Sequence, residues 1–407
     1  MKRVMPTALL LAWVGTGCQP ALQGLRLGVL LPATGDLAPL GQGMIPAVQV
    51  LVAQVNACGG VNGQPVQVFL EDDQTQPTAG AAAMTKLVEV NRVGGVVGSF
   101  ASSVSQAALD VAVRNQVPMV SPGSTSPEFT ERAKKGEYKG FWFRTAPPDT
   151  YQGAALAQLA RKRGFDRVST VVINNSYGLG FEREFTQAFR QKGGQIVNRP
   201  TRYDPNASTL ETEARSAFAG KPQAVMAAVY AETGALLLKS AYEQGLLAGV
   251  QLLLTDAVQS EAFVASVGKT PQGQSLIAGA IGTVPGADGP ALAALTKLWR
   301  EKRGEAPGPY LPHTWDAAAV IVLAAQAAGS NRGVDIAPKI REVAAPGGQP
   351  VSDVCEGLAL LKQGKDINYQ GASGNVDFDE FGDVVGSYDV WQVTPAGKIK
   401  IIDRVRP

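Results

Sequence analysis

The chain has 407 residues, of which 45% are hydrophobic and 18% are charged. This length exceeds one ordinary domain and fits two, and the composition is that of a globular protein with a large core. Basic and acidic residues number 37 and 35 and form no long basic run. The chain therefore lacks the positive patch that a nucleic-acid-binding protein needs.

Residues 1–17 have the pattern of a bacterial export signal. Lys2 and Arg3 give a basic start, residues 8–14 form an apolar run too short to span a bilayer, and small residues follow. We expect this segment to be removed, which leaves 35 basic residues against 35 acidic ones.

Cys18 follows the small residues at the place where a bacterial lipoprotein carries its lipid. Gly15 stands three places before it, where such cleavage boxes usually have a leucine. We expect a lipidated Cys18, a tether over residues 18–24, and a protein anchored at the periplasmic or extracellular face of a membrane. Cys58 and Cys355 then remain, either as a disulfide or as two buried thiols.

After the tether, buried strands alternate with amphipathic helices, which predicts parallel, doubly wound sheets. The first half has expected strands at residues 25–31, 65–70, 94–97 and 117–120 and expected helices at residues 44–56, 78–90 and 107–113. Residues 141–151, FWFRTAPPDTY, interrupt this alternation. The second half has expected strands at residues 167–173, 195–198, 224–229 and 250–254 and expected helices at residues 181–191 and 233–244.

The two halves share one order of elements, which predicts two similar α/β lobes with a cleft between them. The remaining elements complete these two sheets: strands at 276–281 and 388–393, and helices at 289–301, 310–328 and 351–362. The chain must therefore cross between the lobes several times. Lobe 1 is expected to comprise residues 25–146 and 280–385, and lobe 2 residues 147–279 and 386–407.

Two loops within residues 96–130 are rich in hydroxyl groups. GSFASSVS and SPGSTSP each follow an expected strand, so they lie at the carboxyl ends of neighbouring strands, where α/β folds bind ligands. Hydroxyls and the N–H groups that start a helix favour a small anion such as a carboxylate. Serine and threonine are equally typical of helix caps and turns, so the composition alone leaves both explanations open.

The order of several motifs over residues 25–393 resembles the leucine/isoleucine/valine-binding protein family, the substrate-binding components of branched-chain amino acid ABC transporters. The motifs are TGDLAPLGQG, NACGGVNGQP, GSFASSVSQA, VPMVSPGSTSPEFT, FRTAPPDTYQG, NNSYGLG and NYQGASGNVDFDEFGD. The resemblance implies a type I periplasmic binding fold, in which two Rossmann-like lobes joined by three crossovers close over a ligand. It also implies a small amino acid as ligand, ABC permease subunits as partners, a monomer, no cofactor or metal ion, and no catalytic step.

The resemblance also implies which residues line the cleft. By position, the α-carboxylate is expected to be held by Ser102, Gly123, Ser124 and Thr125. The ammonium is expected to be held by Asp149 and Asp256, and the aromatic rings that line the cleft are those of Tyr177 and Tyr230. Leu40 stands where many amino-acid binders have an aromatic residue, so the side-chain pocket is expected to differ. A zwitterion buried between lobes needs both charges paired, which couples binding to closure.

Ordinary structural explanations compete with these roles. Asp149 would also serve as a helix N-cap, Asp256 as a solvated turn and Tyr230 as core packing. Two other functions compete with amino-acid transport: a sensor of the same fold for amides, urea or short carboxylates, and an exported hydrolase. The single histidine, His313, and the lack of a GxSxG motif or metal-ligand spacing argue against the hydrolase.

Overall fold

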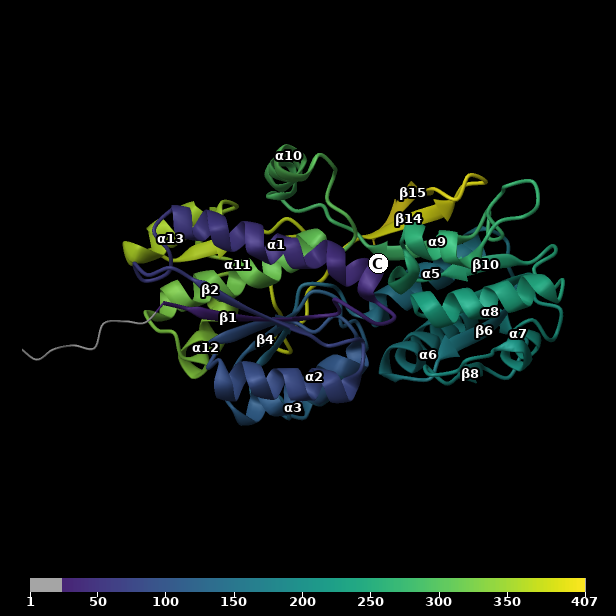
Figure 1. Cartoon of the computed structure of the whole chain (residues 1–407), viewed down its shortest axis with the longest axis horizontal. Coiled ribbons are helices and arrows are strands. Elements are labelled where there is room, and N and C mark those ends of the chain that lie inside the picture. The colour runs from purple at the N-terminus through teal and green to yellow at the C-terminus, as the bar shows by residue number, and fades with distance from the viewer. Residues whose placement is uncertain (1–23, 407) are drawn as a thin grey trace, which may run out of the picture.

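The computed structural model describes residues 24–406, which form two α/β lobes lying side by side (Figure 1). The expected export signal and Cys18 lie outside the described residues. The first sheet has the order β2-β1-β3-β4-β5, and every neighbouring pair is parallel. Its strands are β1 (Arg26–Leu31), β2 (Gln67–Asp72), β3 (Gly95–Gly98), β4 (Met119–Ser121) and β5 (Trp142–Arg144). The continuous apolar run of β1 is typical of a strand covered on both faces.

The second sheet has the order β15-β14-β11-β10-β9-β6-β7, with β8 also paired to β6. Its strands are β6 (Arg167–Ile173), β7 (Gln195–Ile196), β8 (Thr201–Tyr203), β9 (Ala224–Ala228), β10 (Gln251–Leu254), β11 (Ile281–Pro285), β14 (Tyr388–Val393) and β15 (Ile399–Val405). The pairs from β7 to β11 are parallel, whereas β14 and β15 add an antiparallel edge. Both sheets thus confirm the predicted doubly wound α/β class.

Helices cover both faces of the first sheet. One face carries α1 (Ala38–Ala57) and α11 (Leu311–Ala328), against which α12 (Gly333–Glu342) and α13 (Val354–Lys362) pack. The other face carries α2 (Pro77–Thr85), extended by a π-helical turn at Lys86–Val90, and α3 (Ser102–Arg114). The lobe also contains α4 (Glu128–Lys134) and a small parallel pair, β12 (Gln349–Val351) and β13 (Ile367–Tyr369).

Two features fix α1 in place. Within the described range it is the one helix whose length and apolar composition suit a membrane span, but Met44, Val48 and Leu51 lie in the core of the lobe. Cys58, which follows α1, forms a disulfide with Cys355 of α13, and their Cα atoms are 5.9 Å apart. The sequence left this pairing open.

In the second lobe, α5 (Asp149–Lys162) and α6 (Ser176–Gln191) pack together on one face of the sheet. The helices α7 (Glu211–Ala217), α8 (Ala231–Glu243) and α9 (Glu261–Val267) follow one another on the other face. The start of α6 is set by Asn175, whose side chain accepts a hydrogen bond from the N–H of Gly178 at 3.0 Å. α10 (Leu292–Arg303) lies above α1 of the first lobe in this view (Figure 1).

Three segments carry the chain between the sheets: residues 145–148, residues 286–291 and residues 370–387. The expected boundary at residues 279 and 280 is wrong, because β11 pairs with β10 and β14 in the second sheet. The expected strand at 276–281 begins only at Ile281, and α9 connects β10 to β11 as an ordinary parallel crossover. The second crossing therefore comes after Pro285.

Candidate functional site

The two lobes touch through loops that follow strands. The hydroxyl of Ser126, after β4, donates a hydrogen bond to the carbonyl oxygen of Ser176, after β6, at 3.1 Å. At another point Asp36, in the loop after β1, accepts hydrogen bonds from the backbone N–H of Glu232 and from the Thr233 hydroxyl, the latter at 3.0 Å. Because these hydrogen bonds connect the two lobes directly, the structure shows the lobes in a closed arrangement.

Within the second hydroxyl-rich loop, Ser124 serves the loop itself. Its hydroxyl lies 2.7 Å from that of Ser105 and 3.1 Å from the carbonyl oxygen of Phe100, and its N–H donates to the Ser121 hydroxyl at 2.9 Å. The Gly123 N–H also points at Ser121, at 3.2 Å. The expectation that Ser124 and Gly123 bind a carboxylate is therefore not supported, because their polar groups already have partners.

Gly123 has a steric role instead. A Cβ atom at this position would lie 2.1 Å from the ring of Phe100, so only glycine lets the two hydroxyl-rich loops approach this closely. Ser102 is the first residue of α3, and its hydroxyl accepts a bond from the N–H of Ser126 at 3.2 Å. Thr125 is fully buried and its hydroxyl has no hydrogen-bond partner. The hydroxyl of Thr125 has no partner and that of Ser102 only accepts, so both keep an O–H donor available in this wall.

Asp149 is the first residue of α5 and is fully buried. Pro148 occupies the N-cap position, so the carboxylate is not the helix cap that the sequence also suggested. Neither carboxylate oxygen has a hydrogen-bond partner. Burial, and next the charge of Asp256, raise the pKa of Asp149 well above its usual value; the Thr125 hydroxyl lies close enough to offset part of this rise, although outside hydrogen-bonding geometry.

Asp256, by contrast, is fully engaged. It accepts hydrogen bonds from the Gln152 amide at 2.9 Å, the Tyr177 hydroxyl at 2.9 Å and the Tyr310 hydroxyl at 2.5 Å. Burial raises its pKa, and these donors, led by Tyr310, offset part of the rise. Tyr310 starts α11 in the first lobe and Asp256 follows β10 in the second, so their bond joins the two lobes.

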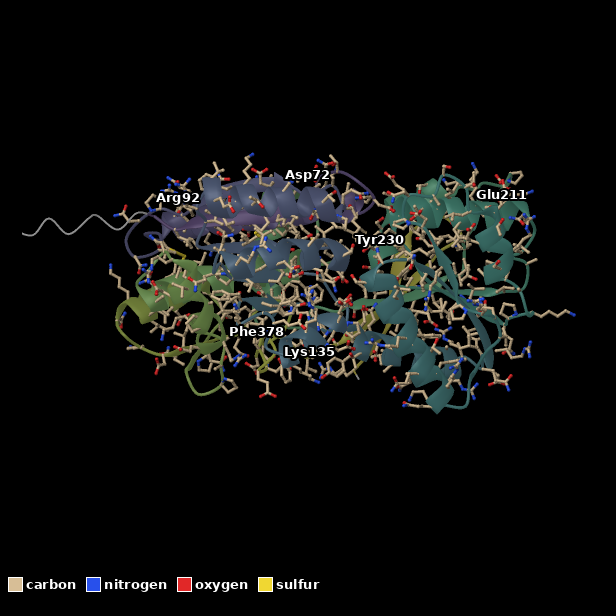
Figure 2. The ribbon with its side chains drawn as sticks, turned by 90° about the horizontal axis from the view of Figure 1, so that it is seen from below. Asp72, Arg92, Lys135, Glu211, Tyr230 and Phe378 are labelled. Carbon is tan, nitrogen blue, oxygen red and sulfur yellow. A yellow bond between two sulfur atoms is a disulfide. The ribbon has the colours of Figure 1, made fainter. Side chains whose placement is uncertain are left out.

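Tyr177 and Tyr230 form the aromatic side of the second lobe. Their rings stack with centroids 5.7 Å apart and planes 19° apart. Tyr230 lies on the part of the second lobe that faces the first (Figure 2), and its hydroxyl is buried without a partner. Thr125, Asp149 and Asp256 therefore lie together at the interface between the two lobes, with Tyr177 and Tyr230 beside them.

Sequence reasoning missed Tyr310 and Gln152 as members of this site. Tyr310 adopts a left-handed backbone conformation with φ of 61°. Its ring packs edge-on against Phe100 of the same lobe, with 4.7 Å between centroids, and its hydroxyl reaches Asp256 of the second lobe. A non-glycine residue in this conformation is uncommon. The sequence does not indicate this conformation, because the proline and glycine residues around Tyr310 are typical of any loop.

A buried ion pair supports the hydroxyl-rich wall from behind. Arg144 at the end of β5 pairs with Asp383 of the third crossover at 2.6 Å, and both side chains are buried. The guanidinium also donates to the carbonyl oxygens of Ser124 at 3.0 Å and Ser126 at 2.9 Å. The position of the loop that carries Thr125 thus depends on a residue of a distant crossover.

Comparison with known proteins assigns the chain to one family. Residues 44–396 match the model of the receptor family ligand binding region. A Leu/Ile/Val-binding protein homolog from Brucella abortus is 27% identical over 350 residues, which cover 84% of this chain and 89% of the homolog.

Two crystal structures have the same fold. A leucine binding protein from Thermotoga maritima aligns with a TM-score of 0.78 and 25% identity, covering 94% of this chain and 99% of that protein. An ABC transporter solute binding protein from R. palustris in complex with 4-hydroxybenzoate aligns with a TM-score of 0.73 and 19% identity, covering 94% of this chain and 97% of that protein. The chain therefore belongs to the receptor ligand-binding-region family, as a periplasmic binding protein of the branched-chain amino acid ABC transporter type.

Proposed function

We propose that this protein is the extracytoplasmic solute-binding component of an ABC importer and binds a small neutral amino acid between its closed lobes. Asp149 carries this proposal, since a fully buried carboxylate without a hydrogen-bond partner is costly unless a cation pairs with it. The ammonium of an amino acid supplies that cation. The protein would then deliver its ligand to permease subunits while lipid on Cys18 holds it at the membrane, and it would catalyse no reaction.

The first lobe supplies the other half of a zwitterion site. The free hydroxyl of Thr125 and the start of α3 at Ser102 provide donors for the α-carboxylate, and Tyr177 and Tyr230 lie beside the ammonium position. An aromatic acid such as the 4-hydroxybenzoate bound by one structural neighbour has the anion but no cation. Such a ligand would leave Asp149 unpaired beside a second negative charge, so the carboxylates favour an amino acid.

A binding panel tests this proposal. We expect leucine, isoleucine, valine and alanine to raise the melting temperature and to bind in calorimetric titrations, whereas 4-hydroxybenzoate and acetate do not. Stabilisation by benzoates or acetate without any by amino acids would refute the ammonium site. Turnover of a bound compound would refute the purely binding role.

Ligand binding should release protons and weaken on acidification. In the closed arrangement, burial raises the pKa of Asp149 when no cation is beside it, and an ammonium there must lower that pKa. The affinity is therefore highest at a pH above the raised pKa and falls as the pH drops through it, because protonated Asp149 no longer attracts the ammonium. Calorimetric titration in two buffers of different ionisation enthalpy measures the released protons, and Asp149→Asn should release none by this route.

Asp36→Ala should weaken amino-acid binding about fivefold. Asp36 of the first lobe accepts hydrogen bonds from residues at the start of α8 in the second lobe, as a helix cap does. Loss of a helix cap typically costs about 1 kcal/mol, and here the cost falls on the closed state alone, because only closure brings Asp36 to α8. The matched control is Asp353→Ala, which removes a cap from α13 inside the first lobe, where Asp353 accepts from the Glu356 N–H at 2.9 Å. The control should lower the melting temperature without changing the Kd; equal Kd values for Asp36→Ala and the wild-type protein would contradict the closing role.

A further inference from the structure

A pocket of about 300 Å³ lies beneath α10. The hydroxyl-rich loops and Asp149 do not line it. One wall comes from the second sheet, with Val284 of β11 and Asp389 of β14, and the facing wall comes from residues 306–310 and the first turn of α11 in the first lobe. The cavity is thus bounded by both lobes, as the proposed amino-acid cleft is.

Two buried polar side chains line this cavity without a complete set of partners. His313 is 2% exposed and Gln259 is 7% exposed, and neither Nδ1 of the histidine nor Oε1 of the glutamine has a hydrogen-bond partner. Burial lowers the pKa of His313 to about 3, so its imidazole is neutral at pH 7. A buried polar group without a partner is destabilising, and a ligand that forms a hydrogen bond to it removes that cost.

The chemistry of the walls defines what fits. A glutamine amide offers an acceptor oxygen and two N–H donors, a neutral imidazole offers one donor and one acceptor, and neither offers a net charge. The carboxylate of Asp389 is already paired with Arg404 at 2.5 Å. Proline rings and aliphatic side chains form much of the remaining wall, including Pro307, Pro309 and Pro312.

We propose that this cavity is a second ligand site, separate from the amino-acid cleft, for a small uncharged molecule that carries hydroxyl or amide groups. Ions are disfavoured, since no unpaired charged side chain lines the cavity to neutralise them. Hydrogen bonds to His313 and Gln259 hold the ligand, and the proline-rich wall packs against its apolar part.

Tyr310 connects the two sites. Its side chain lines this cavity, and its hydroxyl donates to Asp256 at 2.5 Å. An occupant contacting both lobes stabilises the closed arrangement, so it should tighten amino-acid binding, a consequence that rests on the proposed function. Binding of the uncharged molecule itself does not depend on that function.

The test uses acetamide and 1,2-propanediol as probes on the whole protein without amino acid. We expect both to bind in ligand-observed NMR and to raise the melting temperature, whereas acetate and guanidinium do not. Added leucine should leave probe binding in place or strengthen it. Absence of binding by either uncharged probe, or displacement of both by leucine, would overturn the second site. Probe binding in a protein that ignores all amino acids would instead refute only the proposed function.

Two variants locate the probes. Gly308→Phe extends a ring from the cavity wall, where an added Cβ meets nothing within 4 Å, and should weaken probe binding at least tenfold. Gly43→Phe, on an exposed part of α1 where a Cβ also meets nothing within 4 Å, is its control. Gln259→Leu keeps the side-chain size and should also weaken probe binding while leaving leucine binding intact. Wild-type probe affinity in both cavity variants would refute the site.

Discussion

Replacement of Asp149 by alanine should weaken amino-acid binding by about 2–5 kcal/mol, which is roughly 30-fold to several thousand-fold in Kd. The carboxylate has no partner within the described protein, so its loss leaves the ligand ammonium buried without a counter-charge. Asp149→Asn keeps the size of the side chain and removes only the charge, so it should lose nearly as much. Calorimetric titration with leucine measures both variants.

Asp149→Asn should weaken leucine binding but stabilise the protein when no ligand is bound. An unpartnered buried carboxylate with a raised pKa opposes folding at neutral pH, so Asp149→Asn should raise the free energy of unfolding without ligand. A purely structural aspartate would instead lose stability on replacement. Asp204→Asn, an exposed change in the same lobe, is the control and should alter neither quantity. Unchanged leucine affinity in Asp149→Asn would rule out its ammonium role.

Much of the fold was predictable because each element has a strong local pattern. The buried strands β1, β6, β9 and β10 are apolar runs bounded by turns, and they lie within one or two residues of their expected positions. The lobe boundary near residue 280 failed for a physical reason: β11 is as apolar as a strand of either sheet, and only its pairing with β10 assigns it. The hydrophobic pattern of a strand indicates that the strand is buried, but it does not indicate which strand pairs with it.

Sequence could also place the site only in part. Resemblance brought Asp149, Asp256, Tyr177 and Tyr230 to one interface, which the structure gathers there. It could not tell that Ser124 turns its hydroxyl into the first lobe, since a serine in a loop has the same pattern whether it faces a ligand or a neighbouring carbonyl. Nor could it pair Arg144 with Asp383, because these residues are 239 positions apart and meet only once the third crossover has formed.

That pair leads to the largest expected effect on stability. Asp383→Ala should lower the free energy of unfolding by about 3–5 kcal/mol, because it leaves the buried guanidinium of Arg144 without its carboxylate. It should also weaken leucine binding, since the same guanidinium holds the carbonyl oxygens of Ser124 and Ser126 and so positions Thr125. Urea unfolding and calorimetric titration measure the two effects.

A double variant separates the charge from the packing. Arg144→Met with Asp383→Leu removes both charges together, and such replacements often cost far less than removal of one partner. We expect the double variant to recover most of the lost stability but not the leucine affinity, because no guanidinium then holds the loop. Glu342→Gln, which breaks the exposed pair with Lys339, should change stability by no more than about 1 kcal/mol. If the double variant bound leucine as tightly as the wild-type protein, the ion pair would be needed for folding alone.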